Sequence, residues 1–150
     1  MLVSCGCYSS TGVSFWNINS FIKQHTITGY CVYYPTHMIE LSDGNIALSS
    51  YINSSSLIVI IDSSSYEVKK EIQLEEYITD CSSLCVYDEH SFVYVYKGTF
   101  LQISNEDGSI IFQSEGGNFN GDKGILPLEG GKYFAIQNDK RISLIKPCYV

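Results

Sequence analysis

Two pairs of cysteine residues have a spacing that could bind a metal ion. Cys5 and Cys7 would lie on one face of an extended strand, and Cys81 and Cys85 are separated by three residues, a spacing used by structural zinc sites. A zinc site would need both pairs to converge, and only the second pair has the usual spacing. In a reducing compartment, thiols inside apolar runs act as small hydrophobic side chains instead. We therefore predict neither a metal site nor a cofactor.

A loop near the C-terminus carries oxygen ligands at alternate positions. Asn118, Asn120 and Asp122 are spaced as in loops that wrap Ca²⁺, and Glu129 is the twelfth residue counted from Asn118. Only one of the three is a carboxylate, whereas the affinity of such loops depends on their charge, and Lys123 stands where they have Gly. A Gly- and Asn-rich connecting loop explains the same residues better, and calcium binding by residues 118–122 is left open.

The three histidines give no catalytic arrangement. We expect His25 in an outer strand, His37 before a first strand and His90 in a tight turn. None has the spacing of a metal ligand or of a catalytic triad relative to another histidine or a fixed carboxylate. The chain also lacks a nucleophile elbow, an HExxH motif and a phosphate-binding loop. We therefore predict no catalytic residues and a protein that is not an enzyme.

The elements that would position any site are most evident in residues 38–72. Three apolar runs, at residues 38–41, 46–51 and 57–61, are separated by turns rich in Ser, Asp, Asn and Gly. The uninterrupted run at 57–61 predicts a strand that is covered on both faces. Residues 68–74 alternate apolar and polar side chains, which predicts a half-exposed fourth strand, although the helix-forming residues at 66–77 would also suit a short helix. The segment therefore predicts a four-stranded antiparallel sheet.

Related patterns recur along the chain. The turn that follows Leu41 is matched after Tyr87 and after Leu128, at offsets of 46 and 41 residues, and Asn17 matches Asp62 at an offset of 45. Similar units of this length with four strands each are typical of a β-propeller, whose blades are small antiparallel sheets. We therefore predict a single all-β domain of about fourteen strands, grouped along the chain as three, four, four and three, with two complete and two partial blades. The expected blade segments are residues 1–27, 36–74, 82–115 and 123–146.

The units resemble WD40-type β-propeller repeats. The resemblance rests on residues 41–50 with 57–62 and on residues 2–18, where Ser4-Cys5-Gly6 and Phe15-Trp16-Asn17 stand in the small-residue and Trp-Asp positions of that family. It implies a divergent propeller segment that acts as a protein–protein interaction scaffold. Propellers typically need more blades than this chain supplies. We consider three ways of completing the ring: a longer chain, a homodimer, or another partner with further blades.

Composition narrows the range of partners. The formal net charge is −7, and lysine and arginine total nine without forming a cluster, which argues against binding to nucleic acid or to an anionic membrane. No apolar run approaches the length of a membrane span or of a signal peptide. We therefore expect a cytoplasmic protein whose partner is another protein.

Aromatic residues in the predicted loops are the candidate partner-binding residues. In the orientation of WD40 propellers, the loops that join successive blades share one face, and tyrosine is enriched at protein interfaces. Covering the blade edges is the alternative role for these side chains. Two other functions stay open: a metal-dependent hydrolase or lyase with its site in a propeller channel, and a structural β-domain without repeats. The candidate partner-binding residues are Tyr30, Tyr33, Tyr34, Tyr77 and Phe119.

Overall fold

The part of the chain that the structure describes forms an all-β fold of fourteen strands, as predicted. The computed structural model describes residues 1–6, 12–28, 35–52, 55–74, 83–96, 99–114, 124–129, 132–138 and 141–146. Within these ranges there is no helix, and hence none that is long and apolar enough to cross a membrane.

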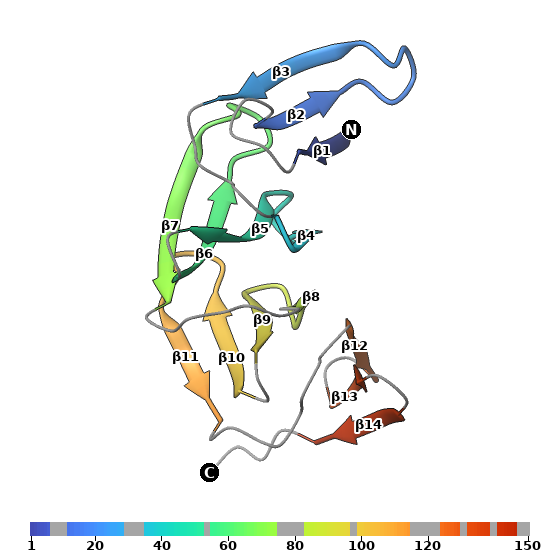
Figure 1. The fold of residues 1–150 in the computed structure, drawn as a ribbon, viewed down its shortest axis with the longest axis vertical. Helices are drawn as coiled ribbons and strands as arrows, with labels where there is room; N and C mark the ends of the chain where they lie inside the picture. The colour runs from blue at the N-terminus through green and yellow to red at the C-terminus, as the bar shows by residue number, and fades with distance from the viewer. Residues whose placement is uncertain are drawn as a thin grey trace.

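The strands make four antiparallel sheets, each built from strands that follow one another along the chain (Figure 1). Sheet A contains β1 (Leu2–Cys5), β2 (Val13–Trp16) and β3 (Lys23–Ile27). Sheet B contains β4 (His37–Glu40), β5 (Ile46–Ile52), β6 (Ser55–Ile61) and β7 (Val68–Leu74). Sheet C contains β8 (Ser83–Val86), β9 (Ser91–Tyr96), β10 (Thr99–Ser104) and β11 (Ile110–Gln113). Sheet D contains β12 (Gly124–Leu128), β13 (Tyr133–Asn138) and β14 (Arg141–Ile145). The predicted grouping into three, four, four and three strands is confirmed.

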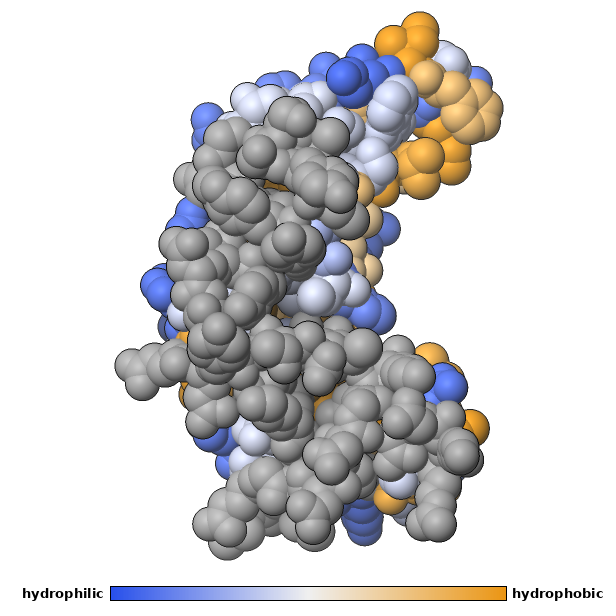
Figure 2. All heavy atoms as spheres, viewed as in Figure 1, coloured by the Kyte–Doolittle hydropathy of each residue, from blue (hydrophilic) through white to orange (hydrophobic). Residues whose placement is uncertain are grey.

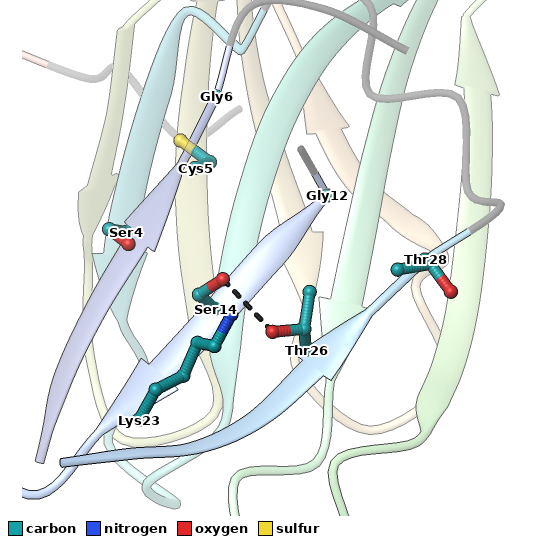
Figure 3. Close-up of a pocket in the computed structure, with 8 residues that line it drawn as sticks. All are labelled: Ser4, Cys5, Gly6, Gly12, Ser14, Lys23, Thr26 and Thr28. Carbon is teal, nitrogen blue, oxygen red and sulfur yellow. Dashed lines mark hydrogen bonds between the residues drawn. The ribbon is translucent and has the colours of Figure 1, made fainter. Parts of the chain in front are cut away.

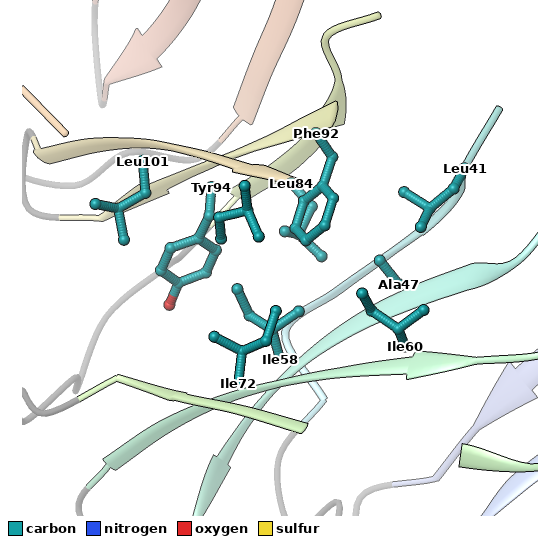
Figure 4. Close-up of a cluster of buried hydrophobic side chains, with 10 residues drawn as sticks. Leu41, Ala47, Ile58, Ile60, Ile72, Leu84, Phe92, Tyr94 and Leu101 are labelled. Atoms are coloured by element: carbon teal, nitrogen blue, oxygen red, sulfur yellow. The ribbon is translucent and has the colours of Figure 1, made fainter. Parts of the chain in front are cut away.

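The sheets stack face to face along an arc. Strands β4, β8 and β12 lie on its concave side, and β7 and β11 lie on its convex side (Figure 1). Apolar side chains fill each space between neighbouring sheets. Between sheets B and C, Ile58 and Ile60 face Phe92 and Tyr94 (Figure 4). Each fully buried side chain of this size contributes about 1.5–3 kcal/mol, so these apolar layers hold the sheets together.

Strand β6 is buried on both of its faces. Residues 57–61 are each at most 9% exposed, because their side chains alternate between the core shared with sheet A and the core shared with sheet C. The prediction of a strand covered on both faces is therefore confirmed. The next strand, β7, exposes Lys69, Lys70 and Gln73 and buries Ile72. The alternation of β7 thus outweighs its helix propensity.

The outer hairpins of sheets A, B and C share one turn geometry. In each, a side-chain oxygen of the last strand residue or the residue after it, on Asn17, Asp62 or Ser104, accepts hydrogen bonds from the backbone amides two and three residues later. Four residues after this position the backbone has a left-handed φ: 55° at Phe21, 61° at Tyr66 and 69° at Gly108. The residue types at two of these positions do not predict this conformation, because phenylalanine and tyrosine adopt it rarely. The shared geometry fixes each outer strand against its neighbour.

Candidate interaction surfaces

The predicted partner-binding residues lie outside the part of the chain that the structure describes. This applies to Tyr30, Tyr33, Tyr34, Tyr77 and Phe119, and also to the candidate calcium loop at 118–122. Their roles therefore stay predictions.

The cysteines that the structure describes lie in or beside the apolar cores. Cys85 is 6% exposed and packs with Val93, Phe100 and Phe134 between sheets C and D. Burial raises the pKa of its thiol to about 12, so the thiol stays protonated at neutral pH. Cys5 is half-buried beside the core of sheets A and B. Cys81, the other half of the candidate zinc pair, is outside the described residues.

The three histidines lie in the strands or turns of three different sheets. His25 is in β3, as predicted, and stacks on Tyr66 with ring centroids 4.9 Å apart. His37 is the first residue of β4, so placing it before the strand was wrong; backbone pairing with Ser49 extends the strand to this residue. Partial burial lowers the pKa of His37. His90 lies in a turn, as expected, with Nε2 3.2 Å from a carboxylate oxygen of Glu89. Among the described residues, no three His, Cys, Asp or Glu side chains gather closely enough to hold a metal ion.

One hollow lies between the turns of sheets B and C. It has a volume of about 370 Å³ and brings together Asp43, Glu89 and Glu106 with Lys69. The hydroxyl of Ser42 donates to the carbonyl oxygen of Glu89 at 2.7 Å, which ties the inner turns of the two sheets together. The polar residues here therefore join the sheets as well as line the hollow.

Sheet A presents a mainly polar surface on the side away from sheet B. We call this surface end face A; its residues are Leu2, Ser4, Ser14, Trp16, Lys23 and Thr26. Ser4, Ser14 and Thr26 are paired across the three strands and form a row of hydroxyl groups (Figure 3). They line a hollow of about 570 Å³.

The hydroxyl and indole groups of end face A are hydrogen-bonded to one another. The Ser14 and Thr26 hydroxyl oxygens are 3.2 Å apart, and the indole Nε1 of Trp16 donates to the Ser4 hydroxyl at 2.9 Å. The ammonium group of Lys23 lies 5.9 Å from the centroid of the Trp16 ring, within cation–π range. The face thus carries one aromatic ring beside a row of satisfied hydroxyls.

Sheet D presents an apolar surface on the side away from sheet C. We call this surface end face D; its apolar residues are Leu126, Leu128, Tyr133, Ala135, Ile142 and Leu144, and it also carries the exposed polar Gln137, which pairs with Ile142. Leu126, Ala135 and Leu144 are paired across the three strands. Leu126 is 59% exposed, Ile142 74% and Leu144 68%. Contiguous exposed apolar groups of this kind mark interaction sites on soluble proteins.

Sequence reasoning missed end face D, although part of the signal was present. In β14, Ile142 and Leu144 occupy alternate positions and so share one face of the strand. In β13, however, Tyr133, Phe134, Ala135 and Ile136 are all apolar. The sequence therefore gives no indication that Phe134 and Ile136 are buried while Tyr133 is exposed.

Comparison with known proteins bears on the fold. No family model and no curated protein matches the chain. The structure is similar to the extracellular domain of a putative one-component system from B. thetaiotaomicron, with a TM-score of 0.66 and 11% sequence identity. The match covers 91% of this chain and 18% of that chain. At this low identity the likeness concerns the fold alone.

Proposed function

We propose that the chain is a segment of a divergent, WD40-like β-propeller and serves as a scaffold for protein–protein interactions in the cytoplasm. On this proposal sheets B and C are complete blades, sheets A and D are partial blades, and the chain carries no catalytic site of its own. The partner is a protein, and neither nucleic acid nor a membrane is bound.

One observation carries the proposal: four small antiparallel sheets stack face to face along an arc, with the strands in the same order from the concave to the convex side. Blades of a propeller are stacked in this way around a central channel. The outer hairpins of sheets A, B and C also share one turn geometry, with the left-handed residue at the same place in each. Both features support a row of equivalent units.

The scaffold role is supported by composition and by the exposed apolar groups. The net charge of −7 disfavours polyanionic partners, while end face D offers apolar side chains that a protein could cover. Tyrosines in the connecting segments would add contact area with a polar tip.

Substituting two of the candidate tyrosines tests the role in partner binding. Wild-type chain and the Tyr33→Ala/Tyr34→Ala variant would each be immobilised and exposed to an extract of the cells that produce the protein. Bound proteins would be identified by mass spectrometry. We expect the variant to lose a partner that the wild type retains, with no change in thermal unfolding temperature.

The matched control is Ile110→Ala/Ile111→Ala, which changes two exposed side chains on β11. This control should retain the partner. Equal capture by wild type and the tyrosine variant would refute the assigned binding residues, and a lowered unfolding temperature in the tyrosine variant would assign the tyrosines to packing instead.

A further inference from the structure

Each boundary between neighbouring sheets joins two kinds of face. We call the face that a sheet turns toward the next sheet along the chain its forward face, and the opposite one its backward face. The forward face of sheet B packs on the backward face of sheet C, through Ala47 and Ile60 on one side and Phe92 and Tyr94 on the other. Boundaries A–B and C–D are built in the same way.

The end sheets leave one face of each kind uncovered. End face D is a forward face: its row Leu126–Ala135–Leu144 takes the register positions of Cys85–Val93–Gln102 in sheet C and of Ile39–Ala47–Ile60 in sheet B. End face A is a backward face. The two uncovered faces are therefore of the kinds that meet at all three boundaries inside the chain.

Exposed apolar side chains concentrate at these two ends. Of the eleven large hydrophobic residues that are exposed in the described part of the chain, eight belong to sheets A and D or to the β2–β3 turn, and a ninth, Met1, directly precedes β1. Figure 2 shows apolar groups gathered at the tip of the arc that carries this turn, and more at the margin of sheet D. At the tip, Phe21 is 73% and Ile22 65% exposed. Covering both ends would remove most of this surface from water.

The chemistry of end face A is compatible with an apolar cover. Its hydroxyl groups are already paired with one another or with the Trp16 indole, so covering them would leave few polar groups without partners. Lys23 is the one charged residue among those named for the two end faces. It lies on β3, at the edge of sheet A, where its ammonium group can stay in water while its stem is covered. Two copies can therefore meet here without close like-charge contacts, despite a net charge of −7 on each.

We propose that end face D binds end face A of a second copy of this chain. Two copies related by a twofold axis would use both pairs of faces at once and complete a ring of stacked sheets. This inference rests on the proposed propeller architecture and names the occupant of its uncovered faces.

Sedimentation velocity of the 150-residue chain and of three variants tests the proposal. Leu144→Arg places a charge in the middle of end face D, and Ser14→Arg places one in the middle of end face A. Ile110→Arg, on β11, is the matched control away from both faces. We expect a dimer with twice the 16.8 kDa mass of one chain for wild type and the control. Each end-face variant should dissociate roughly a hundredfold more readily, because an unpaired charge would be buried.

Mixing the two end-face variants tests most directly whether end face D binds end face A. Each variant retains the face that the other has lost, so the mixture should form dimers through one intact D–A contact. A wild-type chain that is monomeric and folded by circular dichroism would overturn the proposal. So would a Ser14→Arg variant that stays fully dimeric, since that result would mean that two D faces bind each other. Partner capture through Tyr33 and Tyr34 is measured separately, so loss of the dimer and loss of the scaffold function are distinguishable.

Discussion

Sheets A and D each pack one face against a four-stranded neighbour and leave the other face uncovered. Their packed faces are alike: Phe15 of sheet A and Phe134 of sheet D are both fully buried, each beside an aromatic ring of the adjacent core. Their uncovered faces differ. The central row of end face A is Ser4–Ser14–Thr26, and that of end face D is Leu126–Ala135–Leu144.

This difference shows that an uncovered sheet face can be either polar or apolar. In sheet B the positions of Ser4 and Ser14 are held by Leu48 and Val59, which are buried against sheet A. Sheet A therefore has hydroxyls where an interior sheet has aliphatic groups, whereas sheet D keeps the apolar character of an interior sheet. The two ends are not interchangeable, which favours a contact between unlike faces over a contact between like ones.

The largest effect should come from truncating the aromatic ring at each packed face. Phe134→Ala and Phe15→Ala should each lower the free energy of unfolding by about 3–5 kcal/mol, because both rings are fully buried. Urea unfolding followed by circular dichroism measures the loss. If one variant lost less than a third of what the other lost, the packed faces of the two end sheets would not be equivalent.

Two glycines provide the next comparison. Gly12 in sheet A has a φ of 55°, and a Cβ there would overlap the carbonyl oxygen of Ile27. Gly124 in sheet D has no heavy atom within 4 Å of an added Cβ. Gly12→Ala should therefore destabilise the fold by about 1–3 kcal/mol, and Gly124→Ala should change stability by at most about 0.5 kcal/mol. Thermal unfolding of both variants checks this, and equal melting temperatures would contradict it.

The smallest expected effect is a loss of stability in acid to which the outer hairpin turn of sheet C contributes and that of sheet A does not. Hydrogen bonds from the backbone amide and then the hydroxyl of Ser109 lower the pKa of Asp107 to about 2. The charged form is thus favoured in the folded state, so its contribution is complete above about pH 4 and is lost as the pH falls toward 2. Asn17, in the turn of sheet A, does not titrate.

Asp107→Asn should remove part of the decrease in stability between pH 4 and pH 2, because no carboxylate remains to be protonated there. Urea midpoints measured across this range would show a shallower slope than wild type, whereas Asn17→Ala should leave the wild-type slope unchanged. An unchanged slope in Asp107→Asn would mean that this turn does not contribute to acid sensitivity.

The sequence was sufficient for the strands and their grouping. The turn residues between apolar runs and the alternation of β7 placed fourteen strands in four groups, and the uninterrupted run at 57–61 identified a strand buried on both faces. These properties depend on turn residues and on burial, and burial is visible in the sequence as the periodicity of apolar and polar residues.

The exposed side chains of β13 and the backbone conformation of the hairpin turns were harder to predict from the sequence. Strand register and the position of the neighbouring sheet decide which side chains of β13 point outward. A segment of only apolar residues indicates neither the register nor the covered face. The left-handed backbone at Phe21 and Tyr66 arises from hairpin geometry that overrides residue preference. The candidate tyrosines Tyr33 and Tyr34 stay predictions.

The fluorescence of Trp16 tests the central claim most directly. It is the sole tryptophan of the chain and lies in β2, on end face A. Leu144 lies in β14, and β2 and β14 are at opposite ends of the arc (Figure 1). If end face D of a second copy covers it, Leu144→Arg should shift the Trp16 emission to longer wavelength and increase its quenching by acrylamide. Dilution of the wild type should produce the same change. Emission and quenching that respond to neither the substitution nor dilution would contradict the proposed contact.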